Sequence, residues 1–120
     1  GVLLMERPED YDRLFAAIPS GLHLNFNLAH SRFAAKAHGF SLEAFIARMR
    51  PRIAAVELSH NDGHGDEHKA LVTGSYVFDW IDALPDVPLI LEFRDATAAI
   101  VAESTALLRD HRPRRRSLGA

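Results

Sequence analysis

The fold of this chain is decided by IAAVELSHNDGHGDEH, residues 53–68. The first six of these residues form an apolar run with a single glutamate, and a run of this length predicts a buried strand. The twelve residues from Glu57 to His68 then contain three histidines and four acids. Proteins of the α/β class place their chemistry on loops that directly follow such strands. The stretch therefore predicts a buried strand and, after it, a loop better suited to a metal ion than to a hydrophobic core.

The composition limits the classes of function. The chain has 120 residues, of which 48% are hydrophobic, so we expect one domain with a packed core. Cysteine is absent, so a metal ion must be bound by oxygen and imidazole, as manganese, magnesium, zinc and iron(II) can be. The net charge of −2 argues against a nucleic-acid partner. With no apolar run of membrane-spanning length and no visible signal peptide, we expect a cytoplasmic protein without a membrane partner.

The order of predicted elements is β-α-β-α-β-α-β-α. Strands are predicted over residues 2–6, 22–26, 53–58 and 89–93, and helices over residues 8–17, 42–49, 77–84 and 96–110. We expect Ser41 to cap the second helix and Asp95 the last one. Residues 27–40 are predicted to be a loop with at most a short helical turn. This alternation predicts an α/β fold with a parallel sheet and helical crossovers.

Two further segments are predicted to be irregular. Residues 61–75 include three glycines and few residues that could anchor them, so we expect this loop to be more mobile than the strands. The basic segment 112–120 is predicted to be a disordered, solvated tail, with a nucleic-acid contact as the alternative. Residues 1–111 would then form the domain.

A polar side chain stands at the C-terminal end of each predicted strand. These four residues are Glu6, Asn27, Glu57 and Glu92. Because side chains alternate along a strand, the four can share one face of the sheet. The opposite face is then apolar and would pack against the helices; it carries Leu3, Met5, Leu24, Phe26, Ala54, Val56, Leu58, Leu89, Leu91 and Phe93. We therefore expect one polar corner at the C-terminal edge of the sheet.

In this arrangement the sequence resembles the xylose isomerase-like TIM barrels, which include sugar phosphate isomerases/epimerases and the related apurinic endonucleases. The segments LME (4–6), VELSHNDG (56–63) and LILE (89–92) resemble strands five, seven and eight of these barrels. The segments NLAH (27–30) and DEHKAL (66–71) resemble the family's Asp-x-x-His and Asp-x-His-x-x-Leu motifs. The resemblance covers residues 1–110 and implies a half TIM barrel, strands five to eight. Its partner would be the missing N-terminal half-barrel or a second copy of the chain.

The resemblance also implies a metal site formed by Glu6, Asn27, Glu57 and Glu92. Two positions depart from the family's pattern, since Asn27 replaces the usual aspartate and Glu57 the usual histidine. The set still contains three carboxylates, so one negative charge has moved between neighbouring strands. A site rich in oxygen ligands favours manganese or magnesium over zinc.

Further roles follow from the same resemblance. In the isomerase branch, Glu6 and Glu92 would be catalytic and move a proton next to a carbonyl. His30, Asp66 and His68 match positions that hold additional metals in the endonuclease branch, and in the isomerase branch His30 would instead contact substrate. The alternative is a loop held by hydrogen bonds. Arg94 would clamp a substrate carboxylate or phosphate, or pair with a neighbouring acid.

The expected function is a metal-dependent sugar or sugar-phosphate isomerase/epimerase. One alternative is a metal-dependent phosphodiesterase of the apurinic endonuclease type, which would need two or three metal ions instead of one. The other is a non-catalytic truncated barrel that acts as a binding module. The number of bound metal ions separates the first two functions, and metal affinity separates both from the third.

Overall fold

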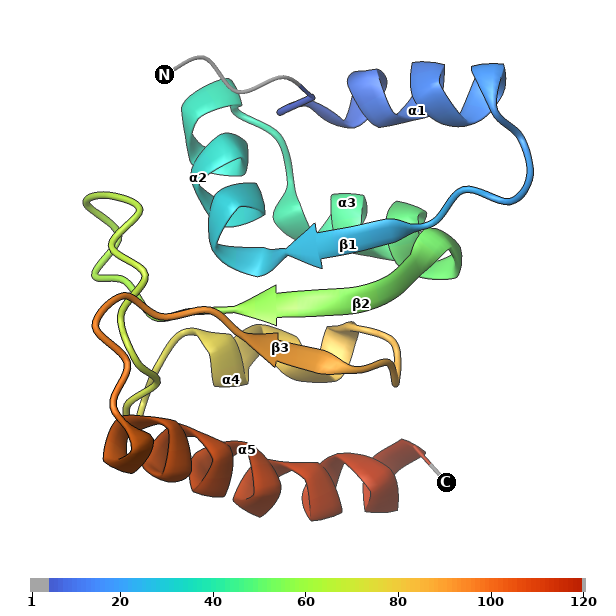
Figure 1. Cartoon of the computed structure of the whole chain (residues 1–120). Coiled ribbons are helices and arrows are strands. Elements are labelled where there is room, and N and C mark those ends of the chain that lie inside the picture. The colour runs from blue at the N-terminus through green and yellow to red at the C-terminus, as the bar shows by residue number, and fades with distance from the viewer. Residues whose placement is uncertain (1–4, 120) are drawn as a thin grey trace.

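The computed structural model describes residues 5–119, and Figure 1 shows that these are built around a parallel sheet with strand order β1-β2-β3. The strands are β1 (Leu24–Asn27), β2 (Ile53–Leu58) and β3 (Leu89–Leu91). The helices are α1 (Pro8–Ala17), α2 (Leu28–His38), α3 (Leu42–Met49), α4 (Val77–Trp80) and α5 (Ala98–Gly119). Short 3-10 turns follow α3 (Arg50–Arg52) and α4 (Ile81–Ala83). The predicted α/β class with a parallel sheet is confirmed, while the half-barrel remains a prediction.

The helices α1 and α3 begin where the sequence predicts. Pro8 occupies the first turn of α1, where its missing N–H is not needed, and Asp10 accepts a hydrogen bond of 3.0 Å from the backbone N–H of Arg7. The hydroxyl of Ser41 caps α3 by accepting a 3.1 Å hydrogen bond from the backbone N–H of Ala44. The buried residues of α3 are spaced as one helical face: Leu42, Phe45, Ile46 and Met49.

The prediction of a loop over residues 27–40 is wrong, because α2 occupies most of these residues. The side chain of Asn27 accepts a 3.0 Å hydrogen bond from the backbone N–H of His30 and so caps the helix. The helix ends at Gly39, whose φ of 71° lies in the left-handed region that glycine adopts without strain. Asn27 is also the last residue of β1, so strand and helix follow each other without a loop.

Several predicted boundaries shift. The first predicted strand lies partly outside the described residues, and Met5 and Glu6 are not in a strand. β1 begins at Leu24 instead of residue 22, and β3 ends at Leu91 instead of residue 93. The predicted helix over residues 77–84 is a short α4 followed by a 3-10 turn.

The last helix begins two residues later than predicted. Thr97, not Asp95, accepts a hydrogen bond from a first-turn N–H, that of Ile100 at 3.2 Å. Asp95 has a φ of 53° and lies in the turn before the helix. α5 continues to Gly119, so helix extends into the segment that was predicted to be a tail. None of the described helices is both long enough and apolar enough to cross a bilayer.

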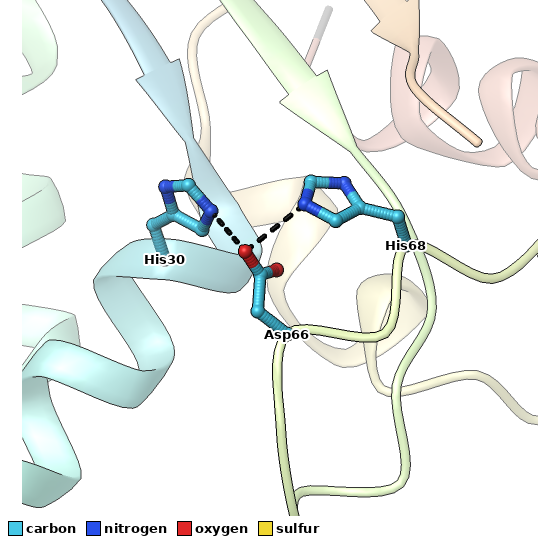
Figure 2. A group of neighbouring side chains, drawn as sticks. All are labelled: His30, Asp66 and His68. Carbon is cyan, nitrogen blue, oxygen red and sulfur yellow. Dashed lines mark hydrogen bonds and ion pairs between the residues drawn. The ribbon is translucent and has the colours of Figure 1, made fainter. Parts of the chain in front are cut away.

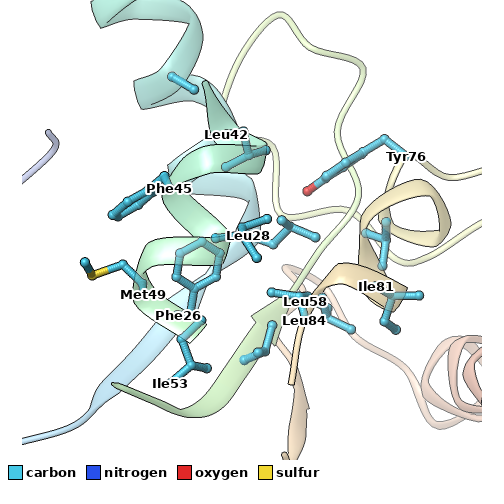
Figure 3. Packing of buried hydrophobic residues seen from close by; sticks show 14 of the residues in the cluster. Phe26, Leu28, Leu42, Phe45, Met49, Ile53, Leu58, Tyr76, Ile81 and Leu84 are labelled. Carbon is cyan, nitrogen blue, oxygen red and sulfur yellow. The ribbon is translucent and has the colours of Figure 1, made fainter. Parts of the chain in front are cut away.

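The core lies between one face of the sheet and the helices α3 and α4, which Figure 1 shows behind the strands. Figure 3 shows how Phe26 and Leu58 from the sheet pack with residues of these helices. Val56 and Leu58 have no exposed surface. Ala54 was predicted on this face but is exposed, because the register between β1 and β2 shifts by one residue after Leu24. The buried residue is Ile53 instead.

The opposite face of the sheet is polar and is not covered by any described helix. α1 lies beyond the β1 edge and α5 beyond the β3 edge (Figure 1). Asn27, Glu57 and Ile90 form one row across the three strands on this face. The side chain of Ile90 is 43% exposed. The structure thus places Asn27 and Glu57 together on a polar face of the sheet.

Candidate metal centre

At the C-terminal edge of the sheet, Figure 2 shows two imidazoles that point at one carboxylate oxygen. The Oδ2 atom of Asp66 lies 2.6 Å from Nε2 of His30 and 3.0 Å from Nε2 of His68. One ligand atom from each residue lies within 4.8 Å of the other two. Within the described residues, no other group of three or more histidines and acids has this spacing. Three of the residues predicted to bind an additional metal or the substrate are therefore adjacent.

Two distant segments position these side chains. His30 stands in the first turn of α2, and the Asn27 cap fixes where that turn begins. Asp66 and His68 belong to the loop after β2. This loop folds back on itself through an antiparallel bridge between His60 and Lys69, with hydrogen bonds of 2.8 and 2.9 Å. His68 directly precedes the bridge, so its backbone is held close to the end of β2.

Charged side chains close the loop around Asp66. The Nζ atom of Lys69 lies 2.8 Å from Oδ2 of Asp62 and 2.5 Å from Oε2 of Glu67. The backbone N–H of Asp62 donates a 3.0 Å hydrogen bond to Glu67. The hydrogen bonds from Lys69 lower the pKa of both carboxyl groups and raise the pKa of the ammonium group. The expectation that this loop has few anchoring residues is therefore wrong.

The base of the loop is held against α2 by Arg32. Its Nη1 atom donates a 3.1 Å hydrogen bond to Oδ1 of Asn61, and its guanidinium lies 4.0 Å from the centre of the Tyr76 ring. The backbone N–H of Gly63 donates to the same amide oxygen at 3.0 Å. The hydroxyl of Tyr76 donates a 2.8 Å hydrogen bond to the carbonyl of Ser59, and burial raises the Tyr76 pKa to about 12.

The three clustered side chains differ in exposure. His30 and Asp66 are 36% and 39% exposed, whereas His68 is 13% exposed. The Nδ1 atom of His68 is buried and has no hydrogen-bond partner, and Oε2 of Glu92 lies 3.9 Å from it. The cluster therefore has two partly exposed members, His30 and Asp66, and one largely buried member, His68.

The structure brings two of the four residues that the resemblance implies as ligands, Asn27 and Glu57, into contact with each other, and it places Glu6 and Glu92 beside histidines instead. The carboxylate of Glu57 accepts hydrogen bonds from the side-chain amides of Asn25 at 2.7 Å and Asn27 at 3.0 Å. The oxygen of the Asn27 amide is the α2 cap, so both ends of that amide have partners. Glu6 lies 2.8 Å from Nε2 of His38. No ligand cluster of the described residues includes Glu6, Glu57 or Glu92.

Arg94 lies beside the cluster. It is exposed, and its backbone N–H donates a 2.9 Å hydrogen bond to the carbonyl of His68. Together with His68 and Glu92 it lines a shallow pocket. The structure thus places Arg94 where an anion near the cluster could reach it.

A second pocket, of about 240 Å³, adjoins His30 and opens along β1. Its polar lining consists of Glu6, Asn25, Asn27, His30 and Ser31. One carboxylate, two amides, an imidazole and a hydroxyl in this arrangement can hydrogen-bond several hydroxyl groups of a ligand.

Sequence reasoning missed three residues that shape this region: Arg32, His38 and Lys69. Arg32 and His38 lie in the segment that was predicted to be a loop, so the missed helix hid them. The sequence did contain a signal for Lys69. Acids stand near both ends of the glycine-rich loop, and a lysine that comes after them can pair with both and close the loop. Comparisons with protein-family models, with curated proteins and with solved structures give no match to this chain.

Proposed function

We propose that His30, Asp66 and His68 bind one divalent metal ion, and that this centre serves a metal-dependent sugar or sugar-phosphate isomerase/epimerase. The observation that carries the proposal is the convergence of the three side chains from segments 36 residues apart in the sequence. Two imidazoles and one carboxylate suit zinc, iron(II) or manganese better than magnesium. The sequence-based ligand set favoured manganese or magnesium, so a preference for zinc or iron(II) supports the three-residue site and a preference for magnesium supports the sequence-based set.

The arrangement supports metal binding over a purely structural cluster. His30 and Asp66 are each more than one third exposed, and a hydrogen-bonded pair at such a position contributes little to stability. The cluster also lies at the C-terminal edge of a parallel sheet, where α/β proteins bind their ligands. A stability role alone does not account for two histidines that share one carboxylate oxygen there.

A bound ion would polarise a carbonyl or hydroxyl group of the substrate. The residues of the chain then have to hold the substrate and move a proton. Glu6 and His30 both line the pocket along β1, so a ligand there can contact both. A carboxylate that accepts a proton must lie within hydrogen-bond reach of it, and Glu6 is the candidate base on this side.

The second candidate function is a phosphodiesterase of the apurinic endonuclease type. It is favoured by one observation: the clustered residues are those that the resemblance assigns to an additional metal in that branch. Phosphodiester cleavage by such enzymes uses two or three metal ions, whereas isomerisation uses one. Counting the bound ions by elemental analysis after dialysis separates the two functions.

Metal titration calorimetry tests the proposed site. We expect His30→Ala, Asp66→Asn and His68→Ala each to lower zinc or manganese affinity by at least about tenfold, the equivalent of about 1.4 kcal/mol. His64→Ala is the matched control, because His64 is an exposed histidine of the same loop outside the cluster. Glu57→Gln should change the affinity by less than about twofold. A parent protein that binds no metal, or a Glu57→Gln variant that loses as much as Asp66→Asn, contradicts the proposed site.

A proton-exchange assay tests the chemistry. The metal-loaded protein is incubated in D₂O with a panel of aldoses, ketoses and their phosphates. We expect deuterium to enter at the carbon next to the carbonyl, and Asp66→Asn to abolish this exchange. Hydrolysis of bis(p-nitrophenyl) phosphate without exchange into any sugar would instead support the phosphodiesterase.

A further inference from the structure

We infer that Glu92 is a positioning residue for the proposed metal centre: it accepts a hydrogen bond from Nδ1–H of His68 and so aims Nε2 of His68 at the metal. This inference rests on the proposed function and assigns Glu92 a role different from the ligand role that the sequence suggested.

The orientation of the His68 ring is the first observation. Nε2 is the ring nitrogen that faces Asp66, at 3.0 Å, so Nδ1 lies on the side of the ring away from the cluster (Figure 2). Nδ1 is buried and has no hydrogen-bond partner. A buried polar atom without a partner is unfavourable, so this nitrogen requires an acceptor.

Glu92 supplies the acceptor that fits. Its Oε2 atom lies 3.9 Å from Nδ1 of His68, about 1 Å longer than a hydrogen bond. The Glu92 side chain is 50% exposed and can rotate. Two backbone hydrogen bonds fix the Glu92 backbone next to the His68 ring. The N–H of Glu92 donates to the carbonyl of Leu58 at 3.1 Å, and the N–H of Arg94 donates to the carbonyl of His68 at 2.9 Å. A rotation of one side chain therefore closes the gap.

The chemistry of metal-bound histidine explains why such a contact matters. A histidine ligand usually donates its second ring N–H to a carboxylate, which fixes the tautomer and raises the basicity of the ligating nitrogen. Loss of such a partner typically costs ten- to hundredfold in metal affinity. Glu92 itself lies outside the group of residues whose ligand atoms converge. It thus acts on the metal through His68.

A double-mutant cycle separates positioning from direct ligation. Zinc affinity is measured for the parent, Glu92→Ala, His68→Ala and the double variant. We expect Glu92→Ala to lower affinity about tenfold in the parent and less than about twofold when His68 is already removed, because its effect passes through that ring. Glu92→Gln should stay within about threefold of the parent, since its amide oxygen accepts the same hydrogen bond. Glu103→Ala, on an exposed position of α5, is the charge-matched control.

Nitrogen-15 NMR of the zinc-loaded protein gives a second readout that does not depend on residual binding in His68→Ala. We expect a protected Nδ1–H signal from His68 in the parent that is absent in Glu92→Ala, while the His30 signals stay unchanged. If the parent binds no zinc, the proposed function fails. If the parent binds zinc, three results would each overturn the positioning role of Glu92 and leave the metal centre standing. They are an unchanged zinc affinity in Glu92→Ala, an affinity of Glu92→Gln as low as that of Glu92→Ala, and a loss of affinity from Glu92→Ala that persists when His68 is removed.

Discussion

Asn27 has two hydrogen-bond partners at the sheet edge. Its amide oxygen caps α2 through His30, and its amide nitrogen donates to Glu57. An aspartate, the residue that the resembled family usually has here, could keep the cap but not the donated hydrogen bond. The asparagine is therefore explained by its neighbour Glu57, without any appeal to a metal.

This pairing predicts how Asn27→Asp behaves. The variant keeps the α2 cap but places two carboxylates about 3 Å apart, in place of an amide–carboxylate hydrogen bond. We expect it to be less stable than the parent at pH 7 and close to the parent near pH 3.5, where the pair can hold a proton. Asn27→Ala should lose about 1 kcal/mol or more at both pH values, because the cap is gone. Urea denaturation at the two pH values measures this; a pH-independent difference between Asn27→Asp and the parent would refute the pairing argument.

Tyr76 predicts a loss of stability in alkali. Burial, opposed in part by the nearby Arg32, raises its pKa from 10.0 to about 12. Because the folded state keeps the phenol neutral longer than the unfolded state does, its contribution is complete below pH 10 and is lost as the pH rises to about 12. Absorbance at 295 nm should show a phenolate step near pH 12 that Tyr76→Phe removes. A step for Tyr76 near pH 10 would contradict the burial argument.

At the scale of elements, the loop between His60 and Lys69 behaves as a closed hairpin. Lys69 pairs with both Asp62 and Glu67, and the His60–Lys69 bridge closes the base of the loop. Asp66 projects from this hairpin toward α2. The geometry of the proposed metal site therefore depends on ion pairs that lie entirely outside it.

We expect Lys69→Met to loosen the hairpin without unfolding the sheet. Amide exchange should become faster in residues 61–68 and stay slow in β2, and zinc affinity should fall by about three- to tenfold because Asp66 must be reordered on binding. Lys36→Met, at an exposed position of α2, is the control. In the parent, the same loosening should appear as the pH falls below about 4, because the pKa values of Asp62 and Glu67 are lowered and their contribution is lost on protonation. Unchanged exchange in Lys69→Met would show that the ion pairs do not hold the loop.

The sequence determined some elements and not others, for physical reasons. β2 is an almost continuous apolar run, and α3 has a strong helical pattern with a serine cap, so their predicted bounds match the structure. α2 was missed because its buried face consists of only Leu28, Ala29 and Ala35, a faint pattern, and because its cap is also the last residue of a strand. The His30–Asp66 contact depends on the pairing of β1 with β2 and on the folding of the hairpin, which local patterns do not encode. The sequence thus named His30, Asp66 and His68 as candidates but did not show that they converge.

At the scale of the molecule, the sheet is open. The three described strands leave β1 and β3 each with one unpaired edge, and one face carries Asn27, Glu57 and the exposed Ile90. A closed parallel barrel needs about eight strands. The three described strands do not close such a barrel, so the half-barrel stays a prediction.

We expect the isolated chain to self-associate. Exposed strand edges pair readily with other strands, and the uncovered face brings Ile90 into contact with a second copy. Sedimentation velocity should show a weight-average mass that rises with concentration, and Ile90→Lys should reduce this rise. A monomer that stays constant in mass over a hundredfold range of concentration, and that unfolds cooperatively, would show that the open sheet is stable alone.

Because β1 and α2 join without a loop, the geometry of the site depends on the number of residues at this junction as well as on the identity of its side chains. One residue inserted after Asn27 would turn the start of α2 by about 100° and shift it by about 1.5 Å along its axis. His30 would then face away from Asp66, although every side chain of the cluster is still present. The same insertion beside Gly39, where the chain already reverses in a turn, leaves the start of the helix untouched. In a library of single-residue insertions, we therefore expect an insertion after Asn27 to disrupt the proposed metal site. We expect an insertion beside Gly39 to be tolerated.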